Sequence, residues 1–134
     1  METVTTIAIE PNHIDELGHV NNTFYVAYLE QARGDWYERA GISFSQMNER
    51  GIGTVLVRLD IQFKKELLLE DRPTVHTIPH RLGNKSFVFR QVMYNQRKEV
   101  VAEAAVTNVM FDVKQRKSIP VAEEIRKFFP KTEE

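Results

Sequence analysis

The sequence contains no cysteine among its 134 residues. Disulfide bonds and thiolate metal sites are therefore excluded. The chain begins Met1-Glu2-Thr3 and lacks the basic start that a secretory leader carries. From these two features we expect a cytoplasmic protein.

Neither sign of charge is in excess, because 18 Lys and Arg against 19 Asp and Glu leave a formal net charge of −1. The chain thus lacks the global basic field that holds nucleic acid or an anionic membrane, and we expect neither as a partner. The longest apolar run is Phe24–Leu29, far short of the ~18 residues that a membrane-spanning helix needs. We therefore expect a soluble chain.

The composition is that of a globular protein, with 42% hydrophobic and 28% charged residues. A chain of this length buries roughly two thirds of its unfolded surface around one core. No internal repeat, linker or composition shift divides it. The sequence therefore predicts a single domain over residues 1–134.

A long helix is predicted from about Thr23 to Ala40. Asn21 and Asn22 precede it with side chains suited to an N-cap, and Gly41 is placed to end it. Its first turns, Phe24–Leu29, are apolar on every side, which predicts a helix that is buried all round at this end. A second, short helix is expected after Pro120.

Five strands are predicted by alternating or β-branched runs. They cover Thr3–Glu10, Val55–Phe63, Pro73–Leu82, Lys85–Asn95 and Val100–Phe111. Pro79 indicates either an edge position or a bulge in the third strand. A strand, a long helix and then four strands in antiparallel succession predict an α+β fold, with one sheet wrapped around one helix.

The loop before the long helix carries the residues best suited to chemistry. Hydrolysis of an ester-like bond needs a carboxylate and N–H donors aimed at the developing oxyanion. Asp15 supplies the first, and free N–H groups at the helix start near Asn22 supply the second, while Gly18 lets a ligand approach the backbone. Asp and Asn before a helix are more often turn formers and caps, so the spacing alone leaves both interpretations open.

The segment Asp15-Glu16-Leu17-Gly18-His19-Val20-Asn21-Asn22-Thr23-Phe24-Tyr25 resembles a known signature, Asp-x-x-Gly-His-Val-Asn-Asn-x-x-Tyr. This signature belongs to the 4-hydroxybenzoyl-CoA thioesterase-like branch of the hotdog-fold superfamily. The resemblance extends over nearly the whole chain. It implies a hotdog fold, with one five-stranded antiparallel sheet around a long central helix. It also implies a homodimer joined sheet edge to sheet edge, with active sites at the interface and with tetramers common.

The resemblance implies an acyl-CoA thioesterase without a cofactor. Asp15 would be the catalytic carboxylate, as general base or nucleophile. The amide near Asn22 would polarise the thioester carbonyl, and Gly18 and His19 would help to position it. His19 is equally compatible with an ordinary loop residue. Glu30 is the next candidate acid if Asp15 proves dispensable, although its spacing from Arg33 favours an ion pair.

Substrate-binding residues are predicted at both ends of the CoA ester. Tyr25 and Tyr28 of the helix would line the acyl pocket together with the partner's strand around Val57 and Leu59, for an aromatic or medium-chain acyl group. Lys85 and Ser86 follow a Gly-Asn turn, where they would meet the phosphates of CoA. A second basic group is formed by Lys114, Arg116 and Lys117. Solvated turn charges explain these lysines equally well.

Other functions were weighed against these residues. The histidines and acids at His13, Asp15, His19, His76 and His80 match no known ligand spacing, so no metal is predicted. A non-catalytic acyl-CoA-binding hotdog protein would keep the helix and strands without needing Asp15. A thioesterase acting on acyl-carrier-protein would keep the same chemistry. An unrelated α+β fold would predict a monomer.

Overall fold

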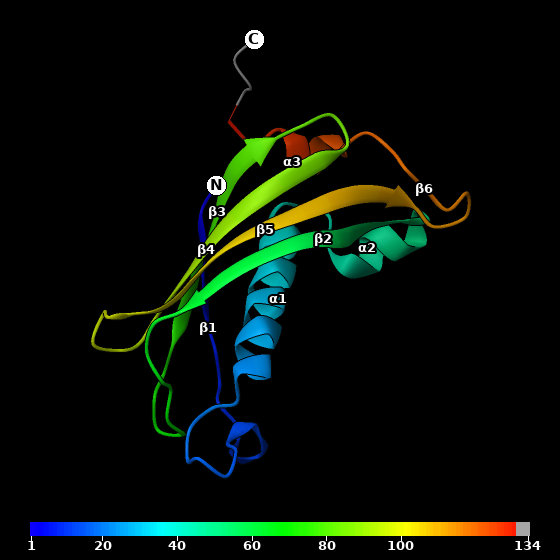
Figure 1. Ribbon diagram of the computed structural model, residues 1–134. Coiled ribbons are helices and arrows are strands. Elements are labelled where there is room, and N and C mark those ends of the chain that lie inside the picture. Colours follow the sequence, from blue (N-terminus) through cyan, green and yellow to red (C-terminus); the bar gives the residue numbers. More distant parts are fainter. Residues whose placement is uncertain (131–134) are drawn as a thin grey trace.

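One antiparallel sheet curls around one long helix in the computed structural model, which describes residues 1–130 (Figure 1). The sheet runs in the order β1-β3-β4-β5-β2, and the short β6 pairs with β5. The strands are β1 (Thr3–Thr6), β2 (Ile52–Phe63), β3 (Thr74–Leu82), β4 (Ser86–Tyr94), β5 (Val100–Asp112) and β6 (Lys117–Ser118). All five predicted strands are present, and β6 adds a sixth.

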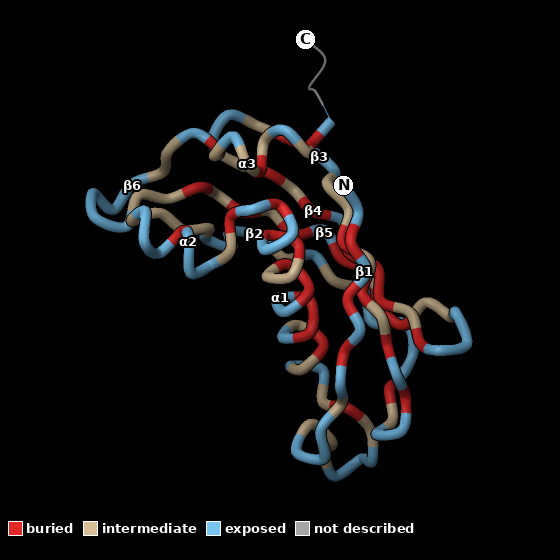
Figure 2. Tube along the Cα trace, turned by 180° about the vertical axis from the view of Figure 1, so that it is seen from behind, coloured by how far each residue is buried: buried red, intermediate tan, exposed pale blue. Residues whose placement is uncertain are grey.

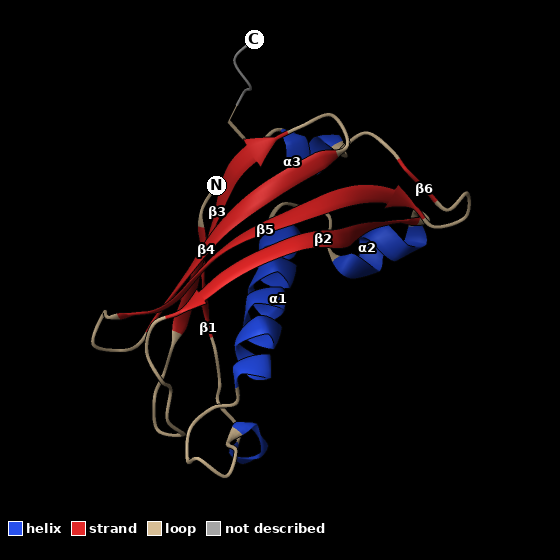
Figure 3. Cartoon of the chain, viewed as in Figure 1, coloured by secondary structure: helices blue, strands red, loops and turns tan. Residues whose placement is uncertain are grey.

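Helix α1 spans Asn22–Arg39 and lies against the inner face of the sheet (Figure 3). Its start is fixed by Asn21, whose side chain accepts a hydrogen bond from Thr23 N at 3.0 Å. The prediction that its first turns are buried all round is wrong, because Ala27 is exposed within the chain and Phe24 and Val26 are only partly buried. The sheet covers only one side of the helix, so the opposite side faces outward.

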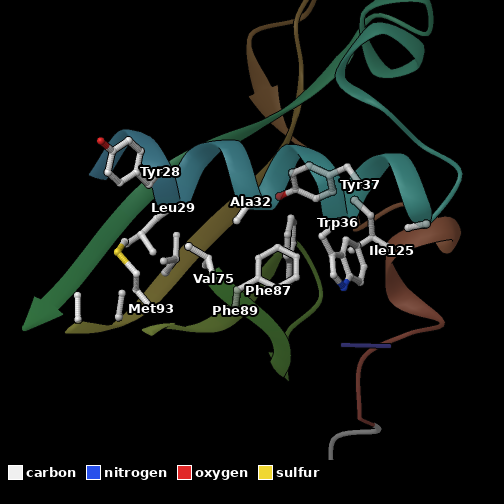
Figure 4. Close-up of a cluster of buried hydrophobic side chains, with 14 of the residues drawn as sticks. Tyr28, Leu29, Ala32, Trp36, Tyr37, Val75, Phe87, Phe89, Met93 and Ile125 are labelled. Atoms are coloured by element: carbon white, nitrogen blue, oxygen red, sulfur yellow. The ribbon is translucent and has the colours of Figure 1, made fainter. Parts of the chain in front are cut away.

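An aromatic cluster fills the space between α1 and the sheet (Figure 4). Trp36 is fully buried, and its ring lies 4.9 Å from Phe89 and 5.9 Å from Phe129. The predicted short helix after Pro120 is present as α3 (Glu123–Arg126), and Ile125 closes the cluster from that side. Such rings supply large apolar areas, and buried residues occur along the whole length of α1 (Figure 2).

Helix α2 (Phe44–Glu49) was not predicted. Ser43 begins it with a capping box, in which Gln46 N donates to the Ser43 hydroxyl and Ser43 N donates to the Gln46 side chain. The Ser-x-x-Gln spacing was present in the sequence, but six residues are too few to show a helical period.

Two details of the strands test the prediction. β1 ends at Thr6. Ile7 N still donates to Pro73 O, but Pro73 has no N–H to donate in return, and the chain then leaves the sheet for the 3₁₀ turn Pro11–His13. At Pro79 the ladder shifts register between Pro79 and Arg81, so a bulge is confirmed. The edge alternative holds locally as well, because β1 pairs with β3 only over Thr74–Thr77 and leaves Pro79 with a strand partner on one side, β4.

β2 forms one edge of the sheet and pairs only with β5 among residues 1–130. It is long for an edge strand, with 12 residues, and four of its large apolar side chains are exposed. These are Val55, Leu56, Val57 and Phe63. Within the same part of the chain, no helix is long and apolar enough to cross a membrane.

Candidate active site

The loop before α1 is a closed turn held by its own backbone. Asp15 N donates to His19 O at 3.0 Å, and Gly18 N donates to Asp15 O at 3.0 Å. Gly18 has a φ of +86°, a left-handed conformation that a side chain would strain. The loop is attached to the rest of the protein by Val20 N, which donates to Leu67 O at 2.8 Å.

The Asp15 carboxylate is fixed by two hydrogen bonds. Oδ1 accepts from Leu17 N at 3.0 Å, and Oδ2 accepts from the Asn21 side chain at 3.4 Å. The first bond is the turn-forming contact that the structural interpretation expects. His19 Nδ1 lies 4.0 Å from Oδ1 and donates to Val20 O, so it stands beside the carboxylate without a hydrogen bond to it. The carboxylate remains partly accessible, with 16% of its side chain exposed.

A hollow of about 640 Å³ opens between this loop and the end of β2. Asp15, His19, Asn22 and Tyr25 line one side, and residues 63–66 line the other. The backbone N–H of Asn22 has no hydrogen-bond partner in the described part of the chain, because Thr23 N and Phe24 N are the amides that Asn21 caps. A free amide and the positive end of the α1 dipole therefore lie in the same hollow as a fixed carboxylate.

Tyr25 and Tyr28 are both buried at the start of α1. Tyr25 lies in the hollow, and its hydroxyl donates to Lys65 O at 3.0 Å. Burial raises the pKa of each tyrosine to about 12, so both hydroxyls remain protonated at neutral pH. Tyr28 lies one turn further along the helix and does not line the hollow.

His13 is a structural residue that sequence reasoning did not place. Its Nδ1 accepts from Glu10 N at 3.2 Å and lies 2.6 Å from the Tyr28 hydroxyl, which therefore donates to it. Its ring also stacks on Phe24 at 4.1 Å. These contacts hold the loop against the helix. No sequence pattern identifies them, because they depend on the path of the loop.

Four predicted binding residues lie away from Asp15 within one chain. Val57 and Leu59 are on the edge strand β2, where Val57 is 55% exposed and Leu59 packs against the core. Lys85 and Ser86 lie at the β3–β4 turn. The Arg126 side chain of α3 donates to Asn84 O in this turn, which lies near the C-terminal end of α1, far from Asp15. The structure thus gathers Asp15, Gly18, His19, Asn22 and Tyr25, and it separates them from Lys85 and Ser86 (Figure 1).

The predicted Glu30–Arg33 ion pair is absent among residues 1–130. Glu30 is exposed, whereas Arg33 is buried and donates to the Gln91 side chain at 3.0 Å. Burial lowers the pKa of Arg33. In the same part of the chain, no group of three or more histidines and acids is arranged to hold a metal ion.

Comparisons with known proteins agree with this architecture. Residues 9–129 match the family described as the thioesterase-like superfamily. Long-chain acyl-CoA thioesterase FadM of Escherichia coli (strain K12) is 33% identical over 123 residues, which cover 91% of this chain and 92% of that protein.

Solved structures share the fold. A hypothetical protein from Thermus thermophilus superposes with a TM-score of 0.89 and 26% identity, over 98% of this chain and 100% of that one. A DHNA-CoA thioesterase from Staphylococcus aureus superposes with a TM-score of 0.84 and 20% identity, over 89% and 80% of the two chains. The predicted α+β hotdog fold is confirmed. This chain belongs to the thioesterase-like superfamily.

Proposed function

We propose that this protein hydrolyses acyl-CoA thioesters, with Asp15 as the catalytic carboxylate. The observation that carries the proposal is the hollow itself, where the hydrogen-bonded Asp15 carboxylate and the free Asn22 N–H lie together. The 33% identity to a protein named as a long-chain acyl-CoA thioesterase supports the same activity.

Two routes lead from this pair of groups to the products. As a base, Asp15 takes a proton from water, hydroxide adds to the carbonyl, the C–S bond breaks, and the thiolate recovers the proton. As a nucleophile, Asp15 adds to the carbonyl itself, the thiolate leaves, and water cleaves the mixed anhydride. In both routes the Asn22 N–H donates to the carbonyl oxygen as it becomes negative. Gly18 and His19 shape and line the approach to that oxygen.

We further propose that the site is completed in a homodimer through β2. Ser86, Val109 and Val55 stand in one row across β4, β5 and β2. If two β2 strands pair in antiparallel fashion, the row of one chain approaches the Phe63 end of β2 in the partner. Phe63 lines the Asp15 hollow, so the row would lie beside the partner's hollow. Val57 and Leu59 would then border the partner's acyl pocket next to Tyr25 and Tyr28, and Lys85 with Ser86 would approach the CoA phosphates.

The named relatives differ in the acyl group of their substrates. FadM is named for long-chain esters, and the Staphylococcus aureus structure is named for an aromatic one. The buried rings of Tyr25 and Tyr28 fit an apolar acyl group of either kind. A panel of short, medium, long and aromatic acyl-CoA esters, followed by thiol release, measures the preference directly.

The deciding experiment compares Asp15→Asn with the native protein on that panel. Asn keeps the oxygen that accepts from Leu17 N, so we expect the loop to fold, while kcat falls on the order of 10²–10⁴-fold with the loss of the base or nucleophile. Glu49→Gln is the control, since Glu49 is an exposed carboxylate that does not line the hollow. We expect it to retain native activity.

Two results would contradict the proposal. Full activity in Asp15→Asn would exclude Asp15 and turn attention to Glu30. Binding of CoA esters by the native protein without hydrolysis would favour the non-catalytic binding protein. Faster turnover of acyl-carrier-protein esters than of CoA esters would replace CoA by acyl-carrier-protein in the proposed substrate. The assignment of Asp15 as the catalytic carboxylate would be unaffected.

A further inference from the structure

A second hollow lies on the face of the sheet that points away from α1. It has a volume of about 400 Å³, and we call it the Arg72–Lys98 hollow. Its lining residues include Arg72, Thr74, His76, Tyr94, Gln96 and Lys98. Val75 and Thr77 point inward and are fully buried, so the alternating Thr74 and His76 point outward. The catalytic groups proposed above play no part in it.

The hollow combines aromatic rings with unpaired positive charge. The His76 and Tyr94 rings meet edge to face at 4.8 Å. Arg72 and Lys98 are exposed and form no ion pair in the described part of the chain. No carboxylate lines the hollow. The nearby acids are engaged elsewhere, since Glu99 pairs with Lys65 and Arg97, and Asp71 is held by Gln96.

Hydrogen bonds within the protein preorganise the residues around the hollow. The Gln96 side chain joins both walls, since its oxygen accepts from Arg72 N at 3.0 Å and its nitrogen donates to Asp71 at 2.8 Å. Asn95 closes the opposite turn by accepting from Arg97 N and Glu99 N. These contacts fix the backbone at Arg72 and the turn that carries Lys98, and such preorganisation favours ligand binding.

Lys98 is held in an unfavourable backbone conformation. Its φ is +64°, a left-handed value that glycine or asparagine adopts more easily. Arg116 shares this conformation, but its guanidinium stacks on Phe111 at 5.2 Å. Lys98 has no comparable contact among residues 1–130. Instead Lys98 lines the hollow, where it adds a second cation to that of Arg72.

We propose that the Arg72–Lys98 hollow binds a phosphorylated nucleoside. The Tyr94 and His76 rings offer a surface on which a base stacks, and Arg72 and Lys98 take the phosphates. Two sources share this chemistry: a free nucleotide, or the nucleotide end of the CoA ester. The second assignment rests on the proposed function, and it would replace Lys85 and Ser86 by Arg72 and Lys98 as the residues that meet the CoA phosphates. The second source is spatially reasonable, because the Lys65–Glu99 ion pair links the Asp15 hollow to the turn that carries Lys98.

The first experiment measures binding without reference to activity. Adenosine 3′,5′-bisphosphate is titrated calorimetrically into the native protein, Arg72→Ala/Lys98→Ala and Tyr94→Leu. We expect both variants to bind about tenfold more weakly, from loss of the phosphate contacts and of the stacking ring respectively. Lys127→Ala, an exposed lysine at the other end of the protein, is the control and keeps native affinity.

The second experiment assigns the source by comparing two substrates with the same acyl group. If the hollow holds the nucleotide end of CoA, Arg72→Ala/Lys98→Ala raises KM for acyl-CoA about tenfold and leaves kcat unchanged. The same variant then hydrolyses acyl-pantetheine, which has no nucleotide, at the native rate. If the bisphosphate binds here but does not compete with acyl-CoA, the source is a free nucleotide.

The proposal is overturned if the native protein does not bind the bisphosphate, or if the variants bind it as the native protein does. Equal binding of inorganic phosphate alone would also overturn it, since the rings would then contribute nothing. A failure of the proposed thioesterase activity looks different: neither substrate is hydrolysed, while the calorimetric result stands.

Discussion

The Asn21 side chain joins the start of α1 to the candidate catalytic carboxylate. Its oxygen accepts from Thr23 N at 3.0 Å and from the Thr23 hydroxyl at 2.7 Å. Its nitrogen donates to Asp15 Oδ2 at 3.4 Å. One residue therefore supplies both a helix cap and a contact that orients Asp15.

Substitutions at Asn21 separate these two roles. Asn21→Ala removes both contacts, so we expect a loss of about 1 kcal/mol in the free energy of unfolding together with a lower kcat. Asn21→Ser keeps an N-cap oxygen, but its side chain is too short to place a donor where the Asn21 nitrogen meets Asp15, so stability remains near native and kcat still falls. Urea unfolding and thioester hydrolysis measure the two effects. Native kcat in the Ser variant would show that Asp15 needs no help from Asn21.

Glu99 makes part of the stability dependent on pH. The side chains of Asn95, Arg97 and Lys65 hold its pKa at about 2, below the ordinary value of 4.5. A carboxyl whose pKa is lower in the folded protein stabilises it above pH 4.5, and this contribution is lost as the pH falls toward 2.

We therefore expect Glu99→Gln to be less stable than the native protein at pH 7, and the difference to shrink between pH 4.5 and pH 2. The effect is small and decreases with added salt, because the group is solvent-exposed. Denaturation midpoints across this range measure it, with Glu70→Gln as the control at an exposed acid. A difference that stays constant over the whole range would contradict the assignment.

At the scale of elements, one buried polar contact joins α1 to the middle of the sheet. Gln91 accepts from Arg33 and donates to Leu29 O and to the Thr77 hydroxyl, each at 3.0 Å. Arg33 is buried, and its hydrogen-bond partner Gln91 carries no charge. Because water does not solvate a buried cation as it would an exposed one, the Gln91 amide is needed to stabilise the guanidinium charge.

We predict strong coupling between these two residues. Gln91→Leu leaves the Arg33 cation without its amide and costs about 3 kcal/mol or more. Adding Arg33→Leu to that variant removes the buried charge and recovers part of the loss. The double-mutant cycle in urea then gives a coupling of about 1.5–3 kcal/mol. Additive losses would mean that the guanidinium is solvated by water instead.

The elements with local determinants were predictable from sequence. The N-cap of α1 and the Gly83-Asn84 turn each act over a few residues, and both are confirmed. The alternating pattern of residues 55–63 predicted the strand β2 correctly, but not its burial, because Val55, Leu56 and Val57 are exposed in succession. The inward turn of Arg33 was not predictable, because its partner Gln91 is distant in sequence and meets it only through the strand register. The burial of α1 was overestimated for a related reason. The apolar residues of its first turns do not show whether anything covers the side of the helix that faces away from the sheet.

The candidate site divides in the same way. Asp15, Gly18 and Asn22 lie in one loop, so the sequence could place them together, and the hollow contains Asp15 and Asn22. Whether Val57, Leu59, Lys85 and Ser86 join them depends on a second chain and stays a prediction. The Arg72–Lys98 hollow was missed because it forms only when β3 and β4 align Thr74 with Tyr94.

At the scale of the whole molecule, the two edges of the sheet differ. β1 is short, whereas β2 exposes Val55, Leu56 and Val57 along a strand of 12 residues. A long apolar edge with free backbone groups pairs readily with another strand. An identical β2 related by twofold symmetry would pair with these backbone groups and cover these apolar side chains, which is the dimer proposed above.

We therefore expect light scattering to give twice the chain mass of 15.6 kDa, or a larger even multiple. Val57→Lys places a charge in the centre of the β2 edge, so it should give a folded monomer with little thioesterase activity, because each proposed acyl pocket borrows the partner's strand. Val4→Lys, on the opposite edge, is the matched control and should remain a dimer. A native monomer that hydrolyses acyl-CoA at full rate would show that one chain completes the site by itself.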